Sequence, residues 1–206
     1  MARLVVAALG DSITAGSPAW DPDPSARTRI GPALDERSQW EWWAAASDPR
    51  LDFRNFGVYG ERTDEIARRL DVCARGADVL IIQGGINDVA QGRPVETAAE
   101  NLRAMVRRGL ELGLRVLLAD VLPWNAGYPR ADPEIRRLNA LAAAVASDKG
   151  VRLLTFHATL EDEARPGRMR PEWACDGEHP SVEGYRRLGE LAVLPALIEK
   201  GLRSEA

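Results

Sequence analysis

Residues 4–16 read LVVAALGDSITAG, an apolar run that ends in a glycine, an acid and a hydroxyl. A short run of Val, Leu and Ala closed by glycine is typical of a buried strand, and Gly10 permits a sharp turn into a helix. Ser12 is then expected at a helix N-terminus, where its backbone N–H has no intrahelical partner. The partial positive charge there favours a nearby alkoxide or oxyanion. The stretch therefore predicts a strand–turn–helix unit with Ser12 at its bend.

Ser12 alone is also compatible with a plain N-cap serine. The pattern is not the G-x-S-x-G turn of α/β-hydrolases, because Thr14 stands where that motif has its second glycine. The role of Ser12 therefore depends on what the rest of the chain brings to the same place.

The chain alternates short apolar runs with helical patterns. Residues 4–9, 51–56, 79–82, 116–121 and 151–155 predict five strands, of which 51–56 alternates like a strand with one exposed face. Helical stripes cover 95–110, ended by Gly113, and the stretch from Asp132-Pro133 to Gly150. Alternating strands and helices favour a doubly wound α/β fold, with a parallel sheet covered on both faces. A chain of 206 residues suits a single domain, 1–206.

Three segments carry further expectations. Ser181 opens a last helix that Pro195 should kink, with a predicted apolar stripe of Tyr185, Leu188, Leu191, Leu194 and Ile198. Segment 17–38 holds four prolines and no period, so a long loop is expected, and a lid is one use for it. Segment 157–179 is expected to be a second irregular stretch.

The scarce residue types exclude several classes of site. The two cysteines, Cys73 and Cys175, cannot form a C-x-x-C site or a disulfide framework, and no role is assigned to them. Two histidines cannot supply an H-E-x-x-H or three-histidine centre, so no metal is expected. His157 follows an apolar run and is interpreted as structural, which leaves His179 as the candidate base.

Charge and hydropathy bear on partners and location. A net charge of −4 argues against nucleic acid or an anionic membrane as the main partner. No stretch approaches 18 apolar residues, and the short run at 4–9 lacks a cleavage site, so neither a membrane span nor a signal peptide is predicted. A cytoplasmic protein with reduced thiols is the expectation. The oligomeric state is left open.

Ligands of an open parallel sheet bind at the carboxyl ends of its strands. After the second predicted strand comes Gly60, whose backbone N–H can approach a ligand closely because glycine has no side chain. After the third comes Asn87, an amide donor suited to a developing negative oxygen. A turn glycine and an Asx-turn are the alternative interpretations of these two residues.

Asp176 and His179 form the most informative pair. Three positions apart in one turn, they can lie within hydrogen-bonding distance. Pro180 keeps His179 out of the helical region, so the histidine would sit on a fixed corner with a carboxylate to orient its ring. A base that activates a hydroxyl nucleophile needs this arrangement.

The chain resembles the SGNH hydrolase superfamily, also called GDSL esterases and lipases. The resemblance is carried by four sequence blocks in the same order: Gly10-Asp11-Ser12, residues 55–60, Gly85-Ile86-Asn87-Asp88 and residues 176–181. Ile13 replaces the leucine of the GDSL name. The resemblance implies Ser12 as nucleophile, His179 as base and Asp176 as its orienting acid. It also implies an oxyanion hole made by the backbone N–H groups of Ser12 and Gly60 and the side chain of Asn87. A three-layer α/β/α fold with a flavodoxin-like sheet of five parallel strands is implied too, without metal or organic cofactor.

Aromatic residues suggest the substrate class. Four of them fall in segments expected at the active-site edge: Trp20, Trp124, Tyr128 and Trp173. Residues 40, 42 and 43 are tryptophans assigned to helix packing. An aromatic-lined pocket of modest size favours a small-molecule ester with a small to medium acyl group. The alternatives left open are a lysophospholipase or acyl thioesterase, a carbohydrate acetylesterase, and a catalytically silent binding module.

Overall fold

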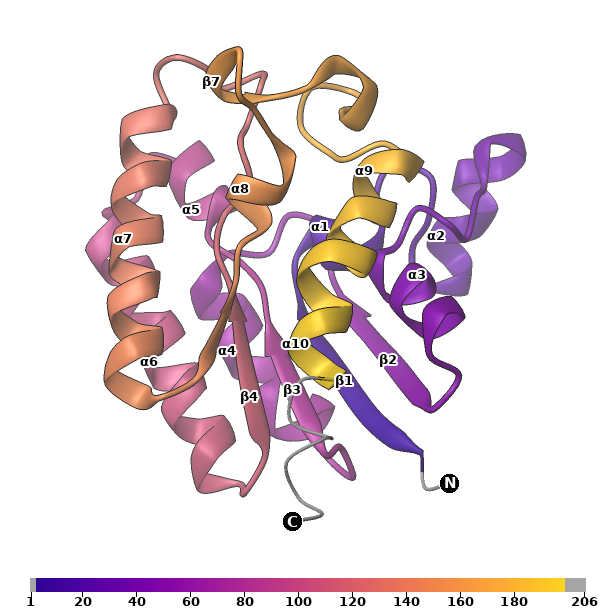
Figure 1. The fold of residues 1–206 in the computed structure, drawn as a ribbon, viewed down its shortest axis with the longest axis vertical. Helices are drawn as coiled ribbons and strands as arrows, with labels where there is room; N and C mark the ends of the chain where they lie inside the picture. The colour runs from indigo at the N-terminus through magenta and orange to yellow at the C-terminus, as the bar shows by residue number, and fades with distance from the viewer. Residues whose placement is uncertain (1–2, 199–206) are drawn as a thin grey trace.

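Five parallel strands form the central sheet of the computed structural model, which describes residues 3–198 (Figure 1). They are β1 (Leu4–Gly10), β2 (Leu51–Gly57), β3 (Val79–Ile82), β4 (Arg115–Ala119) and β5 (Arg152–Leu154), in the order β2-β1-β3-β4-β5. In the register, Ala8 of β1 lies opposite Asn55 on one side and Ile81 on the other. The predicted parallel sheet of five strands is confirmed, although β4 and β5 are shorter than their apolar runs.

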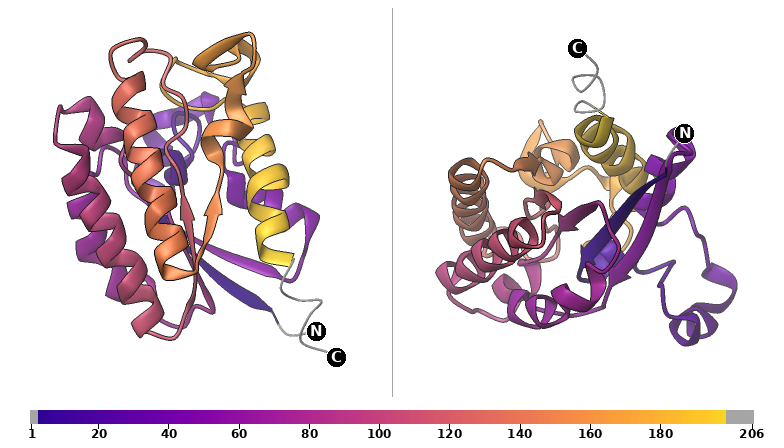
Figure 2. Two further views of the ribbon diagram at one scale, coloured as in Figure 1. Left: turned by 60° about the vertical axis from the view of Figure 1, so that its left-hand side comes forward. Right: turned by 90° about the horizontal axis from the view of Figure 1, so that it is seen from below.

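Helices cover both faces of the sheet, which gives the three layers seen in Figure 2. Ala7 and Leu9 of β1 point into a core with α4 (Thr63–Cys73), α6 (Val95–Glu111) and α7 (Asp132–Lys149). Val6 and Ala8 point into a second core with α3 (Trp40–Ser47), α8 (Phe156–Leu160) and the C-terminal helical elements. Burial on both faces explains why β1 reads as a continuous apolar run.

The C-terminal helix differs from its prediction in one turn. It consists of α9 (Val182–Arg187), a π-helical turn at Leu188–Val193 and α10 (Leu194–Ile198), with Ser181 as N-cap. The turn ends two residues before Pro195, whose ring nitrogen has no hydrogen to donate. The predicted stripe is wrong at Leu191 and Ile198, which are 55% and 40% exposed, because repeated spacings of three drift around a helix of 3.6 residues per turn. Tyr185 and Leu188 are buried as predicted, and the other buried apolar positions are Ala192, Val193, Ala196 and Leu197.

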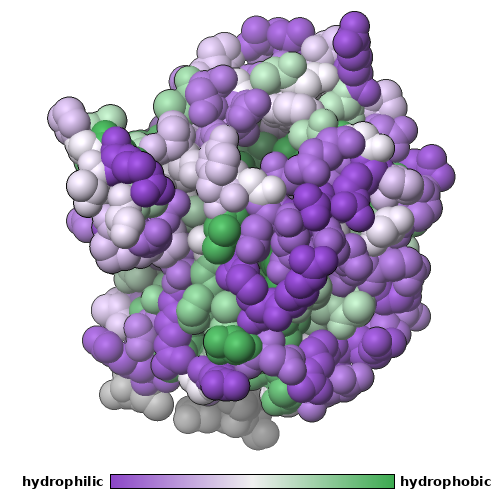
Figure 3. All heavy atoms as spheres, turned by 180° about the vertical axis from the view of Figure 1, so that it is seen from behind, coloured by the Kyte–Doolittle hydropathy of each residue, from purple (hydrophilic) through white to green (hydrophobic). Residues whose placement is uncertain are grey.

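The two segments predicted to be irregular contain regular structure. Segment 17–38 holds α2 (Pro24–Ile30) and the 3-10 turn η1 (Gly31–Ala33), so the expectation of a plain loop is wrong. The Asp23 side chain accepts from the backbone N–H of Ser25 at 2.8 Å, and Pro24 occupies the first helical position. Figure 3 shows this segment projecting at the upper left of the molecule.

The later segment holds α8, the hairpin β6 (Glu161–Asp162) and β7 (Arg165–Met169), and the 3-10 turn η2 (Pro171–Trp173). The backbone N–H of His157 begins α8 by donating to Asp120 Oδ1 at 2.8 Å. Residues 3–198 contain no helix that is both long and apolar enough to cross a bilayer.

Candidate active site

Ser12 lies at the carboxyl end of β1, where the chain turns into the short helix α1 (Ser12–Ala15). The Asp11 side chain caps this helix by accepting from the backbone N–H of Ile13 at 2.9 Å. Gly16 ends the helix in a left-handed conformation with φ +98°, which favours glycine. Asn55 of β2 holds α1 from the other side, since its Nδ2 donates to the Thr14 carbonyl at 2.7 Å. The strand–turn–helix unit predicted around Ser12 is therefore present.

His179 bridges Ser12 and Asp176 through its two ring nitrogens. Its Nε2 lies 3.0 Å from Ser12 Oγ, and its Nδ1 lies 2.8 Å from Asp176 Oδ2. Ser12 and His179 are each 5% exposed, and 167 positions separate them in the sequence. The fold thus brings the three residues into one hydrogen-bonded chain.

The turn that carries His179 is held by hydrogen bonds from its backbone N–H groups to the side chain of Asp176. Asp176 Oδ1 accepts from the backbone N–H groups of Glu178 at 2.9 Å and His179 at 2.7 Å. Burial acts to raise the pKa of Asp176, but the hydrogen bonds from the backbone and ring of His179 and from Glu178 outweigh it, so this pKa is lowered. Asp176 therefore carries a negative charge beside the imidazole at neutral pH.

Asn87 lies in α5 (Ile86–Ala90), directly after β3 and its Gly84-Gly85 turn. Its Nδ2 donates one hydrogen to the Glu61 carbonyl at 2.9 Å, which orients the amide and leaves the second hydrogen for another acceptor. Gly60 precedes Glu61 and has φ +79°, a conformation that favours glycine. An added Cβ at Gly60 would meet no described atom within 4 Å, so this peptide faces open space. The structure thus places the Gly60–Glu61 turn beside Asn87.

Asp88 links these two donor-bearing segments, and the sequence assigns no role to it. Its carboxylate accepts from the Thr63 backbone N–H at 2.9 Å and from the Thr63 hydroxyl at 3.0 Å, in a fully buried position. Asn101 adds a hydrogen bond of 3.0 Å to the same hydroxyl. Because 25 residues separate Thr63 from Asp88, no local pattern indicates the link.

Asp11 is fully buried next to Ser12. Burial raises its pKa to about 6, although hydrogen bonds with the Ile13 backbone and the Gln83 side chain and the nearby His179 act in the opposite direction. The Gln83 side chain also receives the Asp11 backbone N–H at 3.2 Å and the Thr14 hydroxyl at 2.8 Å. Gln83 thereby fixes the turn that presents Ser12.

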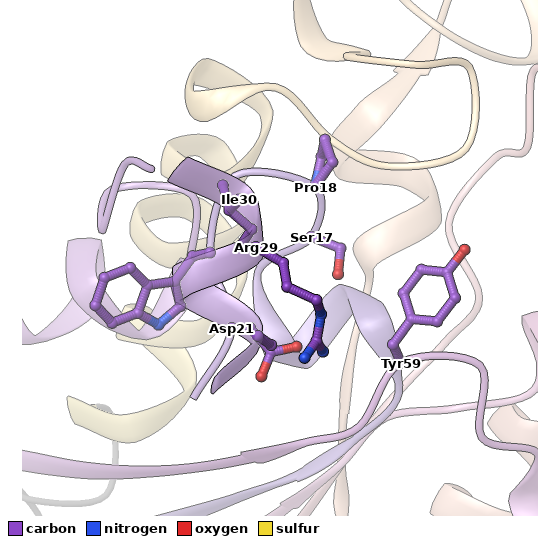
Figure 4. A pocket seen from close by; sticks show the side chains of 8 residues that line it. Ser17, Pro18, Asp21, Arg29, Ile30 and Tyr59 are labelled. Carbon is purple, nitrogen blue, oxygen red and sulfur yellow. The ribbon is translucent and has the colours of Figure 1, made fainter. Parts of the chain in front are cut away.

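Two cavities flank this site. The smaller one, about 80 Å³, is lined by Ser12, Ile13, Ile86, Asn87, Ala90, Trp124, Glu178 and His179. The larger one, about 350 Å³, is lined by Ser17, Pro18, Trp20, Asp21, Ala26, Arg29, Ile30 and Tyr59 (Figure 4). Tyr59 lines the larger cavity and His179 the smaller one, and the centroids of their two rings lie 6.2 Å apart. Tyr59 was not singled out from the sequence.

The four aromatic residues predicted at the pocket have different positions. Trp20 lines the larger cavity and Trp124 the smaller one. Trp173 packs in the core, where the guanidinium groups of Arg170 and Arg187 stack on its ring, and Arg168 stacks over Tyr128. Trp173 and Tyr128 are therefore absent from the linings of these two cavities.

His157 occupies a separate, buried position at the start of α8. Burial is the main cause that lowers its pKa, which fits a neutral structural residue. Cys73 is buried and Cys175 exposed, and both thiols are free. Within residues 3–198 no group of three or more His, Cys, Asp or Glu side chains could hold a metal ion.

Comparison with known proteins supplies the family. The sequence model of the GDSL-like lipase/acylhydrolase family matches residues 8–187. A protein of the G-D-S-L family from Desulfitobacterium hafniense has a similar structure, with a TM-score of 0.74 and 23% identity over 91% of this chain and 97% of that one. An acetyl xylan esterase from Geobacillus stearothermophilus gives a TM-score of 0.72 and 19% identity over 95% of each chain.

The structure of TesA gives a TM-score of 0.69 and 24% identity over 96% of this chain and 98% of that one. None of the curated proteins matches the sequence significantly. The family match spans all four sequence blocks, from Gly10 to Ser181. The chain therefore belongs to the GDSL-like lipase/acylhydrolase family.

Proposed function

We propose that the protein is a serine esterase that hydrolyses carboxylic esters of small to medium acyl groups. The observation that carries this proposal is the chain of hydrogen bonds from Ser12 Oγ through His179 to Asp176, at 3.0 and 2.8 Å. A weakly acidic hydroxyl needs an adjacent base, and that base needs a group to fix its orientation. The lowered pKa of Asp176 supports the same roles, since a charged carboxylate stabilises the imidazolium formed during the reaction.

The reaction follows from this geometry in two half-reactions. His179 Nε2 removes the Ser12 proton as the oxygen attacks the ester carbonyl carbon, which gives a tetrahedral oxyanion. The second Nδ2 hydrogen of Asn87 and the backbone N–H groups of Ser12 and Gly60 are assigned to that oxyanion. The imidazolium then protonates the departing alcohol, and water attacks the acyl-enzyme by the same route to release the acid.

The acyl group is assigned to the smaller cavity. Ser12, Asn87 and His179 all line this space of about 80 Å³, and Ile86, Ala90 and Trp124 supply apolar surface. The carbonyl carbon must lie at Ser12 and its oxygen at Asn87, so the attached alkyl group extends into the space that these residues share. The small volume favours acyl groups of a few carbons over the long chains of lysophospholipids and acyl thioesters.

A carbohydrate acetylesterase is the second candidate, which the small acyl cavity supports equally. A catalytically silent binding module is disfavoured, because Ser12, His179 and Asp176 keep hydrogen-bonding geometry in a site with almost no exposed surface at Ser12 and His179.

The test combines covalent labelling with an acyl-length series. A fluorophosphonate should label Ser12 in the wild-type protein and fail to label Ser12→Ala. Nitrophenyl esters from acetate to decanoate should give their highest kcat/KM among the short acyl groups, with Ser12→Ala inactive on all of them. A labelled peptide that lacks Ser12, or undiminished hydrolysis by Ser12→Ala, refutes the proposal.

A further inference from the structure

The larger cavity has no assigned role in the reaction described above. It lies between α2, the chain at residues 17–21 and Tyr59, and its volume is about 350 Å³. This volume falls in the range of about 300–1,000 Å³ that is usual for small-molecule sites. The segment that walls it projects from the body of the molecule (Figure 3).

The reaction itself indicates which part of a substrate reaches this cavity. The departing alcohol oxygen must receive its proton from His179 Nε2, so the leaving group lies on the His179 side of the bond that breaks. Tyr59 stands next to the His179 ring at 6.2 Å and also lines the larger cavity. If the acyl group occupies the smaller cavity, the leaving group extends from His179 past Tyr59 and into the larger cavity.

Asp21 and Arg29 are the charged side chains that line this cavity. In Figure 4 they extend toward the same part of it, with the Tyr59 ring on the other side. Arg29 makes no hydrogen bond or ion pair with any residue of the described chain, although most arginines there are paired. One Asp21 oxygen accepts from the Asp23 backbone N–H at 2.8 Å, and within residues 3–198 the carboxylate has no ion-pair partner.

The hydrogen-bonding chemistry of Arg29 and Asp21 indicates which class of alcohol this cavity would bind. A guanidinium only donates hydrogen bonds and a carboxylate only accepts them, whereas each sugar hydroxyl does both. One positive and one negative side chain give the lining no net charge, which disfavours a charged leaving group. Tyr59, which is 65% exposed, supplies the apolar surface that the C–H face of a sugar ring can contact.

The geometry points to the larger cavity as a leaving-group subsite for a neutral polyhydroxylated alcohol, in which Arg29 donates to and Asp21 accepts from the hydroxyl groups of a sugar. This inference rests on the proposed esterase function and narrows its substrate to acylated carbohydrates. Arg29 and Asp21 are specificity-determining residues in this assignment, since they contact the departing part of the substrate and not the reacting atoms.

The experiment compares two acetates that differ only in the alcohol: mono-acetylated methyl xyloside and ethyl acetate. The wild-type kcat/KM should be at least about tenfold higher for the sugar acetate. Arg29→Met should lower the sugar-to-ethyl ratio by about 10–100-fold, the usual effect of losing a hydrogen bond to a charged group. Asp21→Asn keeps an oxygen acceptor but loses its charge, so it should lower the ratio by about 3–10-fold. The matched control is Arg107→Met in α6, whose side chain is 68% exposed, and it should leave the ratio unchanged.

A second measurement does not depend on turnover. Unacetylated methyl xyloside should inhibit ethyl acetate hydrolysis competitively, and both subsite variants should raise its inhibition constant. Equal wild-type rates on the two acetates, or ratios unaffected by both variants, overturn the subsite while the esterase function stands. A preference for the acetate of an anionic alcohol, strengthened by Asp21→Asn, also overturns it. Failure of fluorophosphonate labelling at Ser12 would instead remove the proposed function.

Discussion

At the scale of single residues, Asn87 shows how one side chain serves structure and chemistry together. One of its amide hydrogens is held by the Glu61 carbonyl at 2.9 Å, so the other keeps a fixed direction. Donors that are oriented before the reaction stabilise a developing oxyanion without reorganisation. Asn87→Ala is therefore expected to lower kcat for a short-chain ester by about 10²–10³-fold with a smaller change in KM. A loss below tenfold in a protein with wild-type thermal stability would contradict the assignment.

Asp176 gives a second test at this scale. Asp176→Asn keeps an oxygen for the backbone N–H groups of Glu178 and His179, yet removes the negative charge beside the ring. We expect kcat to fall by about 10²–10⁴-fold, because the imidazolium loses its charged partner while the turn keeps its shape. Glu183→Gln, a charge-removing change at a 47% exposed side chain in α9, is the control and should retain most of the activity. Similar rates for Asp176→Asn and the wild-type protein would exclude the orienting role.

At the scale of elements, the link between α4 and α5 positions the assigned oxyanion donors. Asp88 holds the first residue of α4 through two buried hydrogen bonds from Thr63. Asp88→Ala leaves the Thr63 donors without that acceptor, so we expect the free energy of unfolding to fall by about 2–4 kcal/mol. The kcat should fall as well, because the Gly60–Glu61 turn and Asn87 lose their common anchor.

Urea unfolding and ester hydrolysis measure the two effects. Asp71→Ala provides the control. Asp71 lies in α4, the helix that begins at Thr63, and its side chain is 59% exposed and pairs with Arg108 at the surface. If Asp88→Ala matches this control in both stability and kcat, the anchoring role is wrong.

The elements also show how much the sequence could reveal. Buried strands and the long helices α6 and α7 were predictable, because their patterns and end signals are local. The Asp23-Pro24 start of α2 was equally local but stood among other prolines that suggested a loop. The order of the four sequence blocks was enough to predict the Ser12, His179 and Asp176 set. Tyr59, Arg29 and the Thr63–Asp88 link depend on contacts between distant segments, which no periodicity encodes.

At the scale of the whole molecule, buried carboxyls make stability depend on pH. Burial raises the pKa of Asp11 to about 6, that of Asp120 to about 7, and that of Glu41 well above its usual value. Each group binds its proton more tightly in the folded state than in the unfolded state. The folded protein is therefore favoured below the unfolded pKa near 4, and that advantage is lost as pH rises through the folded value. The contribution of these carboxyls to the free energy of unfolding should fall between pH 4 and pH 8.

Asp120 allows this expectation to be tested with one substitution. Its pKa is raised from 3.8 to about 7 mainly by burial, while the backbone N–H groups of His157 and Phe156 act to lower it. Asp120→Asn keeps an oxygen for the His157 N–H but cannot become charged, so the penalty at high pH disappears. Each pKa unit corresponds to about 1.4 kcal/mol. The free energy of unfolding of the variant, relative to that of the wild-type protein, should therefore rise by about 2–4 kcal/mol between pH 4 and pH 8. Urea unfolding across that range measures the difference, with Glu100→Gln, 74% exposed on α6, as the control. Parallel pH profiles for Asp120→Asn and the wild-type protein would show that Asp120 does not titrate in this range, because only a carboxyl that gains its charge there can change the slope.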